Sequence, residues 1–152
     1  MLRRTFLISA AALPLLGCNA TASDAVVTDD YVQAFVDRAI TTYSVEGPDA
    51  LELLNDPEGE FREGSLYIFV VNPNDTIVAN AGSTTSVWQY VGDLVDTNGF
   101  EIGREMRARA TEEGVWISYV FMNPETGIEE NKRSWVRLHE GMIFGAGIYA
   151  AP

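Results

Sequence analysis

The sequence predicts an α+β fold, in which a long N-terminal helix and a connecting helix flank a five-stranded antiparallel sheet. Three observations support this prediction. Apolar residues recur at helical spacing over 28–46, a strand pair follows at 65–81, and three further strands fill 115–149. The strands within each group are separated by short turns, which join antiparallel neighbours. The mature chain is therefore expected to form one domain with a continuous core.

The first predicted helix has a clear beginning and end. Thr28 offers an oxygen for the N-cap, and two aspartates follow it in the first turn. The dipeptide Gly47-Pro48 stops the helix. A second, short helix is expected over 48–54.

The remaining elements are predicted from the spacing of apolar residues and from residues that favour turns. A hairpin is expected from the strands at 65–71 and 76–81, which flank the turn Asn72-Pro73-Asn74-Asp75. A helix is expected over 100–113, with Gly114 as its left-handed C-cap. Three strands then follow at 115–122, 132–139 and 142–149. The segment 82–113 is expected to cover one face of the sheet, leaving a small-ligand pocket beneath it.

The N-terminus has the pattern of an export signal. Arg3 and Arg4 precede an apolar run of about eleven residues, which is shorter than the roughly twenty residues of a membrane-spanning helix. The run ends in Leu-Leu-Gly-Cys18, which resembles the bacterial lipobox. We therefore expect residues 1–17 to be a cleaved signal peptide and Cys18 to carry the lipid of a tether at 18–27. The stretch RRTFL also resembles a twin-arginine signal, so the export route stays open.

Charge and residue counts exclude several classes of protein. Loss of Arg3 and Arg4 takes the net charge from −12 to −14, which disfavours nucleic acid as a partner. Six of the remaining cations lie within 104–137. They could hold a small anion, or they could form ordinary surface ion pairs. With a single histidine and a single cysteine, the chain offers no recognisable catalytic or metal-binding constellation, so we expect no enzyme, no metal and no cofactor.

Three stretches in order carry a family resemblance over 29–149. They are LLNDPEGEFREGSLYIFVVNPNDTIVAN, VGDLVDTNGFEIGREM and GVWISYVFMNPETGIEENKRSWVRLHEGMIFGAGIY. Together they resemble single Cache domains, the PAS-like extracellular sensor modules of bacterial chemoreceptors and histidine kinases. The resemblance implies a Cache fold over 28–150 that binds short carboxylates. Family members usually continue into a transmembrane helix and signalling domains, so this chain resembles a stand-alone exported form.

The resemblance also implies where a carboxylate would bind. Lys132 matches the family lysine and supplies a cation, while tyrosine and tryptophan supply donors on flat apolar bodies. Asn80 stands where the family often has histidine, and Trp135 where tyrosine is usual. Tyr119 is preferred over Trp116 because the two lie on opposite faces of one strand. The predicted site residues are Tyr67, Asn80, Trp88, Tyr119, Lys132 and Trp135.

Two functions follow from this reading. The first is an exported lipoprotein on the periplasmic or outer face of a bacterial membrane, which binds a small organic anion and serves a membrane sensor kinase or a transporter. The second is a structural or interaction lipoprotein that shares the fold and binds no ligand. A ligand screen would separate them.

Overall fold

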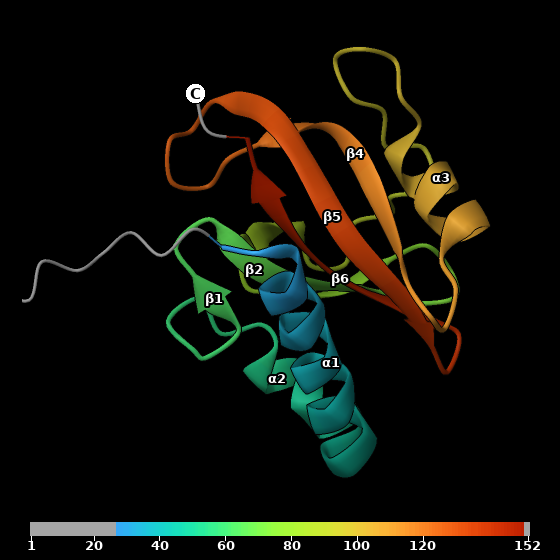
Figure 1. Ribbon diagram of the computed structural model, residues 1–152. Coiled ribbons are helices and arrows are strands. Elements are labelled where there is room, and N and C mark those ends of the chain that lie inside the picture. The colour runs from blue at the N-terminus through green and yellow to red at the C-terminus, as the bar shows by residue number, and fades with distance from the viewer. Residues whose placement is uncertain (1–26, 151–152) are drawn as a thin grey trace, which may run out of the picture.

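The computed structural model describes residues 27–150, so the predicted signal peptide, Cys18 and most of the tether lie outside the described residues. Figure 1 shows a curved sheet with the long helix α1 against one side and α3 near the other. The helices are α1 (Asp29–Glu46), η1 (Gly47–Asp49), α2 (Ala50–Leu53), η2 (Thr84–Ser86) and α3 (Ile102–Arg109). The strands are β1 (Arg62–Glu63), β2 (Leu66–Val71), β3 (Ile77–Asn80), β4 (Val115–Met122), β5 (Glu129–His139) and β6 (Met142–Tyr149).

The five main strands form one antiparallel sheet in the order β3-β2-β6-β5-β4, which confirms the predicted fold class. The strand β2 lies between β3 and β6, and its six residues are all buried. The predicted hairpin is present as β2 and β3, with a register shift between Val70 and Val71. The two-residue β1, which the sequence did not predict, also pairs with β2.

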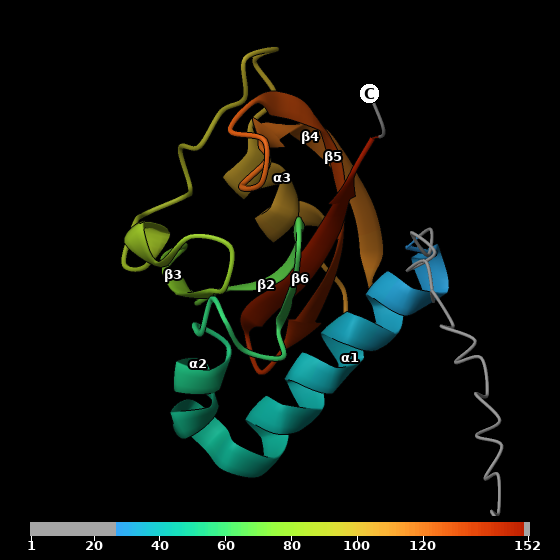
Figure 2. The same cartoon turned by 90° about the vertical axis from the view of Figure 1, so that its left-hand side faces the viewer.

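The helix α1 covers one face of the sheet, as Figure 2 shows from the side. It begins as predicted, because the Thr28 hydroxyl accepts a hydrogen bond from the backbone N–H of Tyr31 at 3.2 Å. Its apolar stripe packs on residues of β2 and β6 to form the first core. Among the members of this core are Val32, Phe35, Val36, Ala39, Ile68, Val70, Phe144 and Ala146.

A second core lies on the opposite face, under the segment that leads from β3 to α3. It includes Tyr67, Phe69, Val71, Val91, Ile102, Met106, Ile117 and Tyr119. The helix α3 is shorter than predicted, since it runs only over Ile102–Arg109 and is capped at Ala110. Gly114 is therefore not its C-cap. It adopts a φ of 96° just before β4, where an added Cβ would lie 2.2 Å from the Trp135 ring.

Within residues 27–150, no helix is both long enough and apolar enough to cross a membrane.

Candidate ligand-binding site

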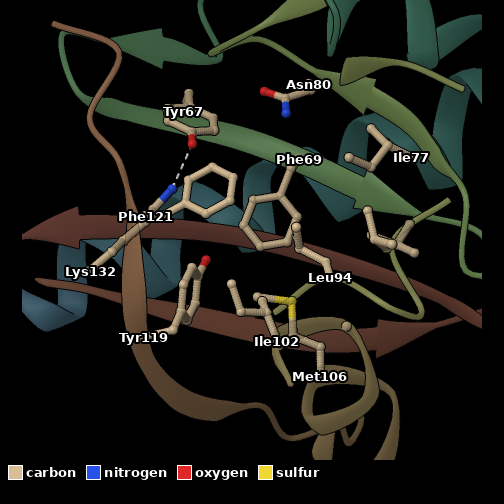
Figure 3. Close-up of a pocket in the computed structure, with 13 residues that line it drawn as sticks. Tyr67, Phe69, Ile77, Asn80, Leu94, Ile102, Met106, Tyr119, Phe121 and Lys132 are labelled. Carbon is tan, nitrogen blue, oxygen red and sulfur yellow. Dashed lines mark hydrogen bonds between the residues drawn. The ribbon is translucent and has the colours of Figure 1, made fainter. Parts of the chain in front are cut away.

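A small cavity lies in the second core, between the sheet and its covering segment (Figure 3). Its volume is about 50 Å³, which leaves room for a ligand of only a few non-hydrogen atoms. Most of its wall is apolar, and the polar exceptions come from β2, β3, β4 and β5. Its lining side chains include Phe69, Ile77, Leu94, Ile102, Met106 and Phe121, together with Tyr67, Asn80, Tyr119 and Lys132.

Lys132 places a positive charge in this apolar surrounding. The residue is only 2% exposed, and its Nζ donates a hydrogen bond to the Tyr67 hydroxyl at 2.8 Å. Aromatic rings surround the amine, with the ring centres of Tyr67 at 3.9 Å and Tyr149 at 4.9 Å. No carboxylate of residues 27–150 forms an ion pair with it. Burial without a counter-ion lowers the pKa of Lys132 to about 7.

A chain of hydroxyl groups fixes the direction of these hydrogen bonds. The Tyr149 hydroxyl donates to the backbone carbonyl of Met122 at 2.7 Å, because a carbonyl can only accept. Its oxygen is then free to accept from the Tyr67 hydroxyl, 3.4 Å away. The Tyr67 oxygen in turn accepts from Lys132. Burial raises the pKa of both tyrosines, so both remain protonated donors at neutral pH.

Two more polar groups face the same space. The Tyr119 hydroxyl is bonded to Ser134 at 2.8 Å, and burial raises the pKa of this tyrosine as well. The Asn80 side-chain oxygen accepts from the backbone N–H groups of Gly82 and Ser83, both at 3.0 Å. These two bonds turn the Asn80 Nδ2 toward the cavity (Figure 3). This nitrogen donates no hydrogen bond within residues 27–150, so it can serve a ligand.

One glycine on β6 makes room for the cavity wall. A Cβ added at Gly145 would lie 2.4 Å from Cζ of the Phe69 ring. The Phe69 side chain lines the cavity, so alanine at position 145 would push the ring into the ligand space.

We therefore expect Gly145→Ala to destabilise the fold by about 1–3 kcal/mol through overpacking and to abolish ligand binding. Chemical denaturation and a ligand-induced melting shift would measure the two effects. Ser118→Ala on β4, an exposed site, serves as the control and should change neither. A Gly145→Ala variant with unaltered stability would contradict the packing described above.

Comparison with known proteins identifies the family. The family model for single Cache domain 2 matches residues 48–150, which is more than half of the chain. This protein belongs to the single Cache domain family. No curated protein matches the chain. The family assignment therefore rests on the domain model, and solved structures add evidence on the fold.

Three solved structures share the Cache architecture. A methyl-accepting chemotaxis protein from Vibrio parahaemolyticus RIMD 2210633 is 16% identical with a TM-score of 0.65, over 79% of this chain and 86% of that one. A periplasmic sensor domain of a chemotaxis protein is 22% identical with a TM-score of 0.61, over 80% and 94%. A Cache chemosensory domain described for carboxylic acid recognition is 17% identical with a TM-score of 0.63, over 80% and 92%. At these identities the likeness concerns the fold.

The Cache cavity brings together four of the six residues predicted from the sequence. These are Tyr67, Asn80, Tyr119 and Lys132. Their roles in binding a ligand remain predictions. Trp116 packs with the first core and Tyr119 belongs to the second, so the expected separation of these two across the sheet is present.

The two predicted tryptophans lie elsewhere, which corrects the sequence prediction. Trp135 stands three residues after Lys132 on β5, and the alternation of a strand places it on the opposite face, against the first core. Its Nε1 is buried and has no hydrogen-bond partner among the described residues. Trp88 follows η2 with a φ of 71°, and its side chain is 75% exposed. Neither residue lines the cavity of the Cache domain.

The sequence prediction missed Tyr149, although a signal for it was available. Glu140 and Gly141 form a two-residue turn between β5 and β6, so His139 pairs with Met142. Moving away from the turn by the same number of residues on each strand places Lys132 opposite Tyr149, as the structure has it. No such sequence pattern was available for Met106 and Leu94, because their position at the cavity depends on how the covering segment folds.

The arginines of 104–137 do not form an anion site. Each of the five is paired with an acidic side chain, so the alternative of ordinary ion pairs is the correct one. The pairs are Arg104–Glu101, Arg107–Asp75, Arg109–Glu105, Arg133–Asp29 and Arg137–Asp37. Lys132 thus differs from every other cation of that region.

Proposed function

We propose that this protein is an extracytoplasmic lipoprotein that binds, and so senses, a short organic acid in the cavity around Lys132. The observation that carries the proposal is a buried lysine without a counter-ion, at the edge of a small apolar cavity. A bound carboxylate would supply the missing negative charge and accept hydrogen bonds from the remaining N–H groups of the amine. Burying a charge is costly unless it is paired, so the ligand-free site is poised for an anion.

The other polar groups fit the same ligand. The Asn80 amide can donate to a carboxylate oxygen, and the apolar side chains opposite, such as Met106 and Ile102, can hold a short alkyl chain. The small volume favours acids with few carbon atoms. The similar Cache structure described for carboxylic acid recognition supports this class of ligand. A membrane sensor kinase or a transporter would be the protein that reads out the bound state.

A thermal-shift screen of the purified protein tests the proposed ligand class. A ligand that binds only the folded state raises the melting temperature as its concentration increases. We expect monocarboxylates of two to four carbons to do so at pH 6. Matched alcohols and amines of the same length are the controls and should have no effect. If no acid shifts the transition, an interaction lipoprotein without a ligand becomes the better account.

The membrane anchor is a separate part of the proposal and rests on the sequence around Cys18. A diacylglycerol on the cysteine would hold the domain firmly, since two acyl chains give stable anchoring. We expect Cys18→Ser to move the protein from the membrane fraction to the soluble fraction when both are compared by fractionation. Retention of that variant in membranes would refute lipid anchoring and leave the binding proposal untouched.

A further inference from the structure

Lys132 is the only lysine in the chain, so it carries the only side-chain amine of the protein. This amine does not lie on the surface, where lysines are usually found. It stands at a cavity wall, 2% exposed and without a carboxylate partner among residues 27–150. An amine of this kind can act as a nucleophile as well as a cation, because desolvation favours its neutral form.

The hydrogen-bond chain leaves the nitrogen lone pair available. Met122 accepts from Tyr149, Tyr149 can then accept from Tyr67, and Tyr67 accepts from Lys132. In this arrangement the neutral amine uses one N–H as a donor and does not accept from Tyr67. Its lone pair and remaining hydrogen are left for the cavity and its aromatic rim.

We propose that the Lys132 Nζ forms a reversible imine with a short aliphatic aldehyde bound in this cavity. The inference rests on the proposed function in one respect, namely that a small ligand can enter beside Lys132. The apolar wall formed by residues such as Phe69, Ile102 and Met106 suits the alkyl chain of the aldehyde.

The reaction needs no group that the site lacks. The lone pair of the neutral amine attacks the carbonyl carbon and forms the C–N bond, while a proton passes from nitrogen to the carbonyl oxygen to give a carbinolamine. The C–O bond then breaks and water leaves with a second proton from nitrogen, which gives the imine. Amine and aldehyde thus yield imine and water, with no oxidation or reduction. The Tyr67 hydroxyl, 2.8 Å from the nitrogen, is placed to relay these protons.

The electrostatic surroundings support this reactivity near neutral pH. The titratable groups that face the amine are the phenols of Tyr67, Tyr119 and Tyr149, and burial raises the pKa of each, so none is an anion there. With the pKa of Lys132 lowered to about 7, about half of the amine is neutral at pH 7. An exposed lysine is almost wholly protonated at that pH.

Reductive trapping of the full chain tests the proposal. We would incubate the protein with propanal and cyanoborohydride at pH 7 and locate the product by peptide mass spectrometry. The expected result is one propyl group on Lys132, added at least tenfold faster in the folded protein than in the same protein in urea. Lys132→Arg keeps the positive charge and should lose the adduct at position 132, and propanoate should slow the labelling of the wild type by competition.

Several results would overturn the imine proposal. One is labelling confined to the N-terminal amine, and another is labelling of Lys132 that is faster in urea than in the folded chain. The comparison with urea uses only the wild type, so it holds even if the arginine variant does not fold. The two proposals can fail separately, because a propanoate-induced melting shift without any imine would leave acid binding intact and refute the imine alone.

Discussion

Replacement of Lys132 by methionine is expected to abolish acid binding and to stabilise the ligand-free protein. Methionine has a similar length and carries no charge, so it removes the cost of burying an unpaired cation. At pH 6 we expect the free energy of unfolding to rise by about 1–3 kcal/mol. Affinity for a short monocarboxylate should fall by roughly 30- to 1000-fold, because the charged hydrogen-bond donor is lost.

Urea denaturation and calorimetric titration measure the two effects of Lys132→Met. Arg133→Met is the matched control, since Arg133 is the next residue along β5, faces the other side of the sheet and pairs with Asp29. That variant should bind the acid normally. A Lys132→Met protein that binds as tightly as the wild type would remove Lys132 from the site, and one that is clearly destabilised would contradict the stated cost of its charge.

The second large effect is a dependence of affinity on pH. The acid must meet a protonated Lys132, whose pKa in the ligand-free protein is about 7. Affinity should therefore be constant from about pH 5.5 to 6.5 and then fall by up to about tenfold for each further pH unit. Titration of the wild type with propanoate between pH 5.5 and 9 would measure this profile. A flat profile up to pH 9 would show that the bound anion does not depend on this amine.

The stability of the ligand-free protein should change in the opposite direction. Above pH 7 the folded state releases the Lys132 proton, whereas the unfolded state keeps it until its ordinary pKa of 10.5. The unfolded state then binds more protons, so stability rises with pH in this window. Between pH 6 and 9 the increase should reach about 2.5 kcal/mol, and Lys132→Met should lack it. Measurements should stop at pH 9. Burial raises the pKa values of Tyr67 and Tyr119, so the folded protein loses stability at higher pH, where these tyrosines ionise in the unfolded state.

The fold could be predicted from the sequence because local signals agreed with one another. Thr28 caps α1, the run of aromatic and β-branched residues in 65–71 marks β2, and the short turns between strands allow only antiparallel pairing. Helix α3 was predicted too long, since the residues around Thr111 and Glu112 continue a polar pattern that is equally suited to a loop. Hydrogen bonding of the Leu138 N–H to the Thr111 carbonyl ties this stretch to β5 in place of a last helical turn.

The site could be predicted only where strand geometry decides it. Tyr67, Tyr119 and Lys132 lie on strands, and their shared face follows from alternation and register. The same alternation excludes Trp135, so that error was avoidable. Trp88 belongs to a loop whose path depends on tertiary contacts, such as the hydrogen bond from its N–H to the Ile77 carbonyl, and no local pattern reveals it.

Acid binding as proposed pairs a buried lysine with an anion, and the ionisation of this lysine can be observed directly. Because Lys132 is the only lysine, a protein labelled with ¹³Cε-lysine gives a single lysine signal in an NMR titration. We predict a pKa near 7 in the free protein and a clear rise when propanoate saturates the site. A signal that titrates near 10.5 in the free protein, or one whose pKa no short carboxylate changes, would contradict the account.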